Sequence, residues 1–179
     1  MDDVFLLATI VRQGSAAGSV CLPAGTMSPV TAARAIFEGV TRSELVTFLR
    51  HHRLCVQTSV SASGAPQAAM VGFGVTDDLE IVFDTLDTTR KVENLRRDPR
   101  VALVVGCGPA EQTVQIEGHA DEPAGSDLER LKAAYFVAHP DGVDRQRWKG
   151  ITYVRVRTTW ARFSDFGHPG GPRVVELRF

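Results

Sequence analysis

The amino-acid sequence predicts a mainly β protein, an antiparallel barrel with a few appended helices. Short segments of alternating apolar and polar residues, or of continuous β-branched residues, recur along the chain. Turns rich in glycine, proline, serine or aspartate separate many of these segments, which is typical of hairpins. Only three segments have clear helical spacing, so strands do not alternate with helices as parallel βαβ units require.

The first half of this pattern begins at a helix start. Thr41 and Glu44 have the spacing of a capping box, in which a hydroxyl and a carboxylate satisfy free amides of the first turn. Polar turns at residues 63–66 and 76–78 then separate three segments of strand character, and Pro99 ends the helical spacing that follows. We therefore expect a helix, three strands and a second helix over residues 41–51, 54–61, 67–75, 79–85 and 88–97.

The second half of the pattern contains more strands and a third helix. Ser126 and Glu129 form a second capping box, which predicts a helix that starts at this serine and is closed by Pro140. Apolar alternation or β-branched runs predict strands before and after this helix. We expect these strands over residues 101–105, 113–120, 151–157, 159–166 and 174–177.

Length, charge and cysteine usage exclude several classes of protein. The 179 residues suit one compact domain, and a net charge of −1 argues against binding nucleic acid or membranes through bulk positive charge. The longest apolar run, residues 4–11, is far shorter than the roughly 20 residues of a membrane-spanning helix. Three cysteines without a CxxC pair favour a reducing compartment, so we expect a cytoplasmic protein. We expect residues 1–40 to be a loosely ordered extension and residues 41–179 the functional domain.

The sequence contains no common metal or nucleotide motif. Its five histidines show neither HxH nor HExxH spacing, so we expect no metal site. It also lacks GxGxxG and GxxxxGK, so neither a dinucleotide fold nor a phosphate-binding P-loop is supported.

The segment after the third predicted strand is the most informative for function. Asp84 and Thr85 end that strand, and Arg90 and Lys91 stand in the first turn of the next helix. Cations are unfavourable there because the helix macrodipole makes the N-terminus positive. They become favourable if an anion such as a phosphate binds among the amides, hydroxyls and cations. The alternative is that both cations are solvated and simply begin a basic helix.

Several short motifs resemble the FMN-binding split-barrel family typified by pyridoxamine 5'-phosphate oxidase. They are Phe83-Asp84-Thr85, Lys91, Asn94-Leu95 and the runs at residues 98–103 and 114–118. The resemblance extends from about residue 41 to residue 166. It implies a six-stranded antiparallel split β-barrel of Greek-key type, and a homodimer with FMN in two clefts between the subunits. Residues 41–179 would then be the FMN-binding domain.

The resemblance also implies cofactor-binding positions. Arg90 and Lys91 match the pair that holds the FMN phosphate, Thr85 matches a hydroxyl beside them, and Asp84 precedes that hydroxyl. Gln112 or Thr113 lies near the glutamine that reaches the cofactor in the family. The strand whose backbone lies along the flavin ring matches Ala69, Met70, Val71 and Gly72.

The ring-contacting strand differs from the family in one charge. The oxidase has an arginine where this chain has Ala69, so Arg90 and Lys91 would have to hold more of the phosphate. Gly72 and Gly74 are interpreted as small residues that allow a flat ring to lie on the strand.

The residues that hold the substrate phosphate in the oxidase are largely replaced. The family's lysine falls at Gly74, its arginine at His139 and its serine at Val143, whereas its tyrosine is kept as Tyr135. We therefore expect an FMN-dependent oxidoreductase that moves a hydride to or from an unidentified small organic substrate, and not the oxidase itself. The alternatives are a deazaflavin- or haem-binding split-barrel protein, or a non-catalytic flavin-binding dimer.

Three residues near the C-terminus have two interpretations. Trp148, Trp160 and Arg162 could reach a flavin across a dimer interface, or could pack within a C-terminal strand. The sequence names no catalytic residue, since the flavin itself supplies the redox chemistry.

Overall fold

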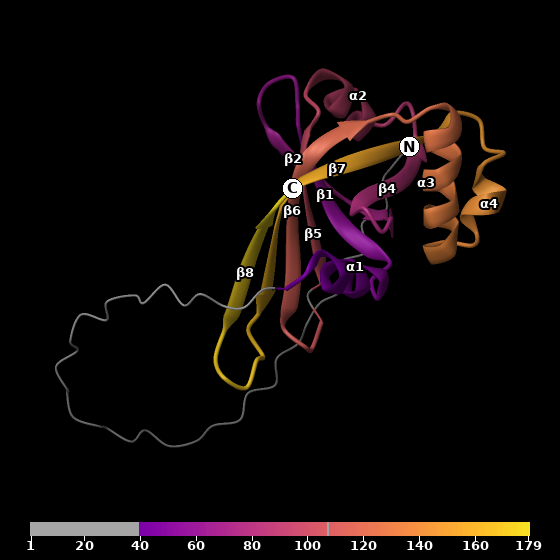
Figure 1. The fold of residues 1–179 in the computed structure, drawn as a ribbon. Coiled ribbons are helices and arrows are strands. Elements are labelled where there is room, and N and C mark those ends of the chain that lie inside the picture. Colours follow the sequence, from indigo (N-terminus) through magenta and orange to yellow (C-terminus); the bar gives the residue numbers. More distant parts are fainter. Residues whose placement is uncertain (1–39, 107) are drawn as a thin grey trace, which may run out of the picture. The chain divides into compact units, whose positions relative to one another are not determined.

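The computed structural model describes residues 40–179 apart from residue 107, and these residues form a sheet with helices at its margins (Figure 1). The predicted extension lies outside the described residues except for Val40, so the domain boundary stays a prediction. Within the described residues, no helix is long and apolar enough to cross a membrane.

The described residues contain eight strands and four helices, each type numbered in the order of the chain. The strands are β1 (Leu54–Val60), β2 (Pro66–Gly72), β3 (Gly74–Val75), β4 (Glu80–Leu86), β5 (Arg100–Gly106), β6 (Gln112–Asp121), β7 (Ile151–Asp165) and β8 (Arg173–Arg178). The helices are α1 (Arg42–Arg50), α2 (Arg90–Arg97), α3 (Gly125–Ala138) and α4 (Gly142–Arg145). The short helix α4 is an element that sequence periodicity did not predict.

All strand pairs are antiparallel, and the sheet follows the order β2-β1-β5-β6-β7-β4-β3, with β8 paired to β7. Only Phe73 separates β2 from β3, although these strands are the two ends of that order. The sheet must therefore curl until its ends meet at this residue, which produces a barrel. The expected antiparallel split barrel is confirmed.

The strand count differs from the expected six for two reasons. The second predicted strand is divided, because the Phe73 amide donates to Arg53 O at 3.1 Å before the next residues pair with β4. The C-terminal strand β8 adds a further segment. In contrast, the two strands predicted over residues 151–157 and 159–166 are one long strand, in which Thr159 forms a bulge between two paired residues.

One of the two predicted capping boxes forms. The Glu44 amide donates to Thr41 Oγ1 at 3.2 Å, and the Thr41 amide donates to Glu44 Oε2 at 2.7 Å, so α1 starts as predicted. The second box is wrong, because α3 begins at Gly125 with Ala124 as its N-cap. Ser126 therefore lies inside the first turn, where its hydroxyl is not placed to cap the helix.

The core has two parts, one on each face of β4. Ile81 and Phe83 point into the barrel interior, which α1 and α2 help to fill. Val82 points the other way, where Leu131 and Tyr135 of α3 cover the outer face. The middle of β4, from Ile81 to Phe83, is buried on both faces, and its C-terminal end leads into α2, where the candidate site lies (Figure 1).

Candidate functional site

Three polar side chains gather where β4 ends and α2 begins. Thr89 is the N-cap of α2, but its hydroxyl donates to Leu86 O at 2.8 Å and makes no capping bond to the helix amides. Thr85 Oγ1 lies 3.3 Å from Thr89 Oγ1 and accepts a hydrogen bond of 3.4 Å from Lys91 Nζ. The structure therefore brings together the hydroxyl and the ammonium predicted for a phosphate site.

Arg90 and Lys91, the cations at this helix start, have no ion-pair partner among residues 40–106 and 108–179. No carboxylate in the described part of the chain forms an ion pair with Arg90 or Lys91, whereas Arg96 near the end of the same helix is held by Glu122 at 2.6 Å. Burial lowers the pKa of the Lys91 ammonium. A partly buried, unpaired cation is unfavourable in isolation, and a bound dianion would compensate it. This arrangement fits a phosphate group.

The predicted ring strand lies beside this helix. Asn94 of α2 donates from Nδ2 to Gln67 Oε1 of β2 at 2.9 Å. Gln67 and Ala69 are two residues apart, so their side chains point to the same face of β2. Ala69 is partly exposed and Met70 is 63% exposed, which leaves this part of β2 accessible.

Asp84 is engaged elsewhere. Its side chain points to the opposite face of β4 from Thr85, toward α3 and α4. Tyr135 Oη donates to Asp84 Oδ1 at 2.6 Å, Arg145 Nε donates to Asp84 Oδ2 at 2.7 Å, and Arg145 also donates to Tyr135 Oη at 2.9 Å. Burial and the adjacent carboxylate raise the pKa of Tyr135. The structure therefore does not bring the Asp84 carboxylate to the cluster of Thr85, Thr89 and Lys91, called the Lys91 group below.

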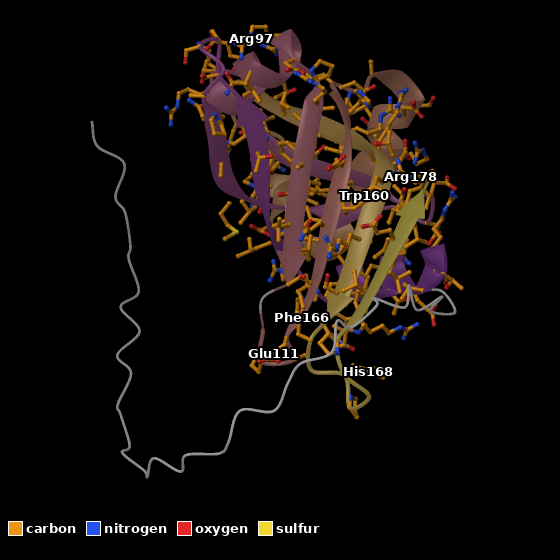
Figure 2. The ribbon with its side chains drawn as sticks, turned by 90° about the vertical axis from the view of Figure 1, so that its left-hand side faces the viewer. Arg97, Glu111, Trp160, Phe166, His168 and Arg178 are labelled. Carbon is orange, nitrogen blue, oxygen red and sulfur yellow. The ribbon has the colours of Figure 1, made fainter. Side chains whose placement is uncertain are left out.

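Gln112 and Thr113 lie at the far end of the barrel within one chain. Gln112 begins β6 and donates from Nε2 to Asp165 Oδ2 at 2.9 Å. Helix α2 borders the other end of β6, and at about 3.3 Å per residue this strand spans about 30 Å. Figure 2 shows Glu111, the residue before Gln112, at the opposite end from Arg97 of α2.

The small residues at the β2–β3 bend serve a different purpose from the one predicted. A Cβ atom on Gly72 would lie 2.7 Å from His139 Cε1, and one on Gly74 would lie 2.7 Å from Tyr135 Cα. The space beside both glycines is thus filled by α3 and the residue that follows it. The interpretation that they are small to admit a flat ring is corrected, because helix packing requires them.

Tyr135 and His139 are internal residues. They are 1% and 6% exposed, and their rings stack with centroids 4.8 Å apart. His139 Nε2 lies 3.1 Å from Arg53 O and 3.2 Å from Phe73 O, so this nitrogen carries the hydrogen and donates to the carbonyls. Neither side chain presents a free group for a substrate phosphate.

The aromatic and cationic residues near the C-terminus do not join the Lys91 group. Trp148 is 57% exposed, and Trp160 and Arg162 are partly buried on β7, opposite Glu117 and Gln115 of β6. The Arg162 Nε atom is buried without a hydrogen-bond partner among the described residues. Both interpretations of these residues remain predictions.

A cavity lies on the outer face of the barrel, apart from the site at the start of α2. It has a volume of about 440 Å³, and its lining includes Arg100 and the exposed residue His119. Within the described residues, no group of three or more histidine, cysteine or acidic side chains could hold a metal ion. The expectation of no metal site stays a prediction.

Sequence reasoning missed three residues that build the site. Thr89 and Gln67 carried no motif, and Asn94 appeared only as part of a family motif without a role. The contribution of Asn94 follows from its burial beneath α2, at 5% exposure. Buried amides normally need partners, but the burial of Asn94 becomes known only from the structure, so the sequence alone gives no signal for its role.

Comparison with known proteins gives one family match and several relatives. The sequence model of the family described as pyridoxamine 5'-phosphate oxidase matches residues 41–164. A pyridoxine/pyridoxamine 5'-phosphate oxidase from Bordetella avium is 31% identical over 134 residues, which cover 68% of this chain and 62% of that protein. The chain therefore spans less than two thirds of the length of this relative.

Solved structures share the fold at low sequence identity. A heme binding protein from Mycobacterium smegmatis superposes with a TM-score of 0.67 and 19% identity, covering 80% of this chain and 60% of that one. A putative pyridoxamine 5'-phosphate oxidase from Listeria innocua superposes with a TM-score of 0.55 and 19% identity, covering 68% and 96%. The same barrel therefore occurs in proteins whose names point to different ligands.

Proposed function

Because this chain belongs to the pyridoxamine 5'-phosphate oxidase family, we propose that it is an FMN-binding oxidoreductase. The observation that carries the proposal is the pair of cations at the start of α2. Arg90 and Lys91 have no carboxylate partner among the described residues, and Lys91 already contacts the Thr85 hydroxyl. A phosphate dianion at this position would supply the missing negative charge.

The roles of the site residues follow from their places in the fold. Arg90 and Lys91 bind the phosphate, and Thr85 offers its hydroxyl beside them. The backbone of β2 from Ala69 to Gly72 supports the ring, with Met70 exposed at this edge. When bound, FMN supplies the hydride-transfer chemistry, so the protein's work is to bind and orient it. The substrate is a small organic molecule.

The complete site requires two copies of the chain. Gln112 and Thr113 can reach the same flavin as Lys91 only if a second copy presents its own β6 start, because within one chain that strand spans about 30 Å. Leu54 and Met70 are 56% and 63% exposed on adjacent strands, so an apolar contact with a second copy could bury them. We propose a homodimer in the cytoplasm with FMN between the subunits.

The substrate is not a B6 phosphate. Such a ligand needs cations or donors, but Tyr135 is bonded to Asp84 and His139 to backbone carbonyls. Gly74 cannot be replaced by a lysine, because its Cβ would meet the backbone of α3 at 2.7 Å. Each missing charged hydrogen bond weakens binding by about 1.5–3 kcal/mol.

Haem binding is a second candidate, favoured by one structural feature. The solved heme binding protein from Mycobacterium smegmatis shares this fold, and His119 stands exposed at the cavity on the outer face. Neutral imidazole is a common axial ligand of haem iron. The remaining alternatives keep the anion site of α2: its cations would bind the phosphate of a deazaflavin, or the FMN of a non-catalytic flavin-binding dimer.

The visible spectrum of the purified full chain separates these proposals. Flavin bands that bleach with NADH or NADPH and return with turnover in the presence of an acceptor support an oxidoreductase. Flavin bands without turnover indicate a carrier, and a Soret band indicates haem. A protein that remains colourless after incubation with FMN would contradict the proposed function.

A further inference from the structure

A buried hydrogen-bond junction joins α2 to the β1–β2 hairpin. Asn94 Nδ2 donates to Gln67 Oε1 at 2.9 Å and to Ser59 Oγ at 3.1 Å. Ser59 and Gln67 are directly opposite each other in the pairing of β1 with β2. One amide group therefore bonds to both strands of the hairpin at a single register position.

The orientation of this amide is fixed by a further bond. Arg97 donates to Asn94 Oδ1 at 3.3 Å and also to Val60 O at the end of β1. The oxygen of Asn94 thus faces a donor and its nitrogen faces two acceptors, which leaves one consistent assignment of the amide. Asn94 is 5% exposed and Ser59 is 4% exposed, so water does not compete freely for these bonds.

The two parts of the proposed cofactor site lie on either side of this junction. Lys91 precedes Asn94 by three residues, which places both side chains on the same face of α2, one turn apart. Gln67 precedes Ala69 by two residues, which places both on the same face of β2. The hydrogen bond from Asn94 to Gln67 directly links α2, the phosphate-binding element, to β2, the ring-binding element.

We infer that Asn94 is a positioning residue, which fixes the start of α2 relative to β2 so that one flavin is held at both its phosphate and its ring. The inference rests on the proposed function. The apolar contacts of Val92 and Leu95 hold α2 against the barrel but are not directional, so they resist sliding weakly. The directional bonds of Asn94 set the helix position along the strand.

Flavins with and without the phosphate provide the test. FMN needs both elements in register, whereas riboflavin lacks the phosphate and needs only β2. In the full-length protein, Asn94→Leu should therefore reduce the ratio of FMN to riboflavin affinity at least tenfold, with riboflavin affinity changed much less. A merely structural role would lower both affinities equally and leave the ratio unchanged.

Two further variants keep the inference falsifiable if Asn94→Leu does not fold. Gln67→Ala removes the partner on β2 at a half-buried position, and should reduce the ratio in the same way. Ser59→Ala is the matched control, because it removes a bond to the same amide nitrogen but leaves the link to β2. It should lower the urea midpoint and leave the ratio near that of the wild type.

A double variant shows whether Asn94 acts through the cation. In a Lys91→Met background, Asn94→Leu should reduce the ratio by a smaller factor than it does in the wild type, because the Lys91 contact to the phosphate is already lost. Additive losses would overturn the inference. A wild-type protein that binds neither flavin would refute the proposed function itself, whereas wild-type FMN binding with unchanged ratios in Asn94→Leu and Gln67→Ala would refute only the positioning role.

Discussion

Replacing Lys91 by methionine should weaken FMN binding and stabilise the ligand-free protein at the same time. Methionine keeps much of the side-chain length but removes the charge that contacts the Thr85 hydroxyl. A hydrogen bond to a charged group contributes about 1.5–3 kcal/mol. Because each 1.4 kcal/mol is a factor of about ten, the expected loss of FMN affinity is about tenfold to a hundredfold. Riboflavin affinity should change little.

The stabilising effect follows from the pKa of the same group. Burial lowers the pKa of Lys91 in the folded chain, so the unfolded chain binds more protons near that pKa. The charged amine therefore destabilises the ligand-free fold at neutral pH, and this penalty declines as the pH rises from the folded pKa to the higher unfolded pKa. Lys91→Met should raise the urea midpoint at neutral pH, and the difference from the wild type should shrink in alkali.

Fluorescence titration with FMN and riboflavin, together with urea unfolding of the ligand-free protein, measures both effects. Arg147→Met is a suitable control, because this exposed arginine follows α4 and its loss removes one positive charge away from α2. It should leave the affinity ratio unchanged. If Lys91→Met retained wild-type FMN affinity, or if riboflavin affinity fell by the same factor, the assigned phosphate site would be wrong.

Three other predictions test neighbouring parts of the structure. Ala69→Arg should increase FMN affinity by about tenfold, since it adds one charged hydrogen bond to the phosphate. An unchanged affinity would contradict the match of Ala69 to the arginine of the oxidase. Gly72→Ala should lower the free energy of unfolding by about 1–3 kcal/mol, because its Cβ would lie 2.7 Å from His139 Cε1; an equal loss in a His139→Ala background would contradict this cause. Arg155 lowers the pKa of Asp121, so stability should fall as the pH drops below about 4, where the unfolded state takes up more protons. Urea midpoints from neutral to acidic pH would check this, and a flat profile would refute it.

The fold could be predicted where local signals and tertiary structure agree. The capping box at Thr41 formed because the helix begins where its hydroxyl can reach a free amide. The same motif failed at Ser126, because the chain enters the helix one residue earlier through Gly125, whose φ is +58°. The motif specifies a favourable cap. It does not specify the direction from which the chain enters the helix, because tertiary contacts decide that direction.

The long strands show a second limit. Phe73 looks like the middle of one strand, yet it is the point where the two ends of the sheet meet and hydrogen bonds pass from β1 to β4. Thr158 lies between two predicted strands, yet β7 continues through it, and the next residue, Thr159, forms a bulge. Alternation reports which face a residue occupies, but not which neighbouring strand accepts its hydrogen bonds.

The candidate site was predictable only in part. Thr85 and Lys91 could be grouped because both lie close to one strand-to-helix junction. Asp84 was grouped with them by its place in the sequence, but adjacent strand residues point to opposite faces. Gln112 lies at the other end of the barrel, and the sequence holds no local signal of that distance. Asn94 depends on long-range contacts, which became visible only in the fold.

The most direct measurement is an experimental structure of the protein crystallised with FMN. We predict that the phosphate lies within hydrogen-bonding distance of Lys91 Nζ and Thr85 Oγ1, and that the ring lies along β2 near Ala69. A flavin whose phosphate binds elsewhere, or a Lys91 side chain that remains bonded only to its own chain, would contradict the assignment.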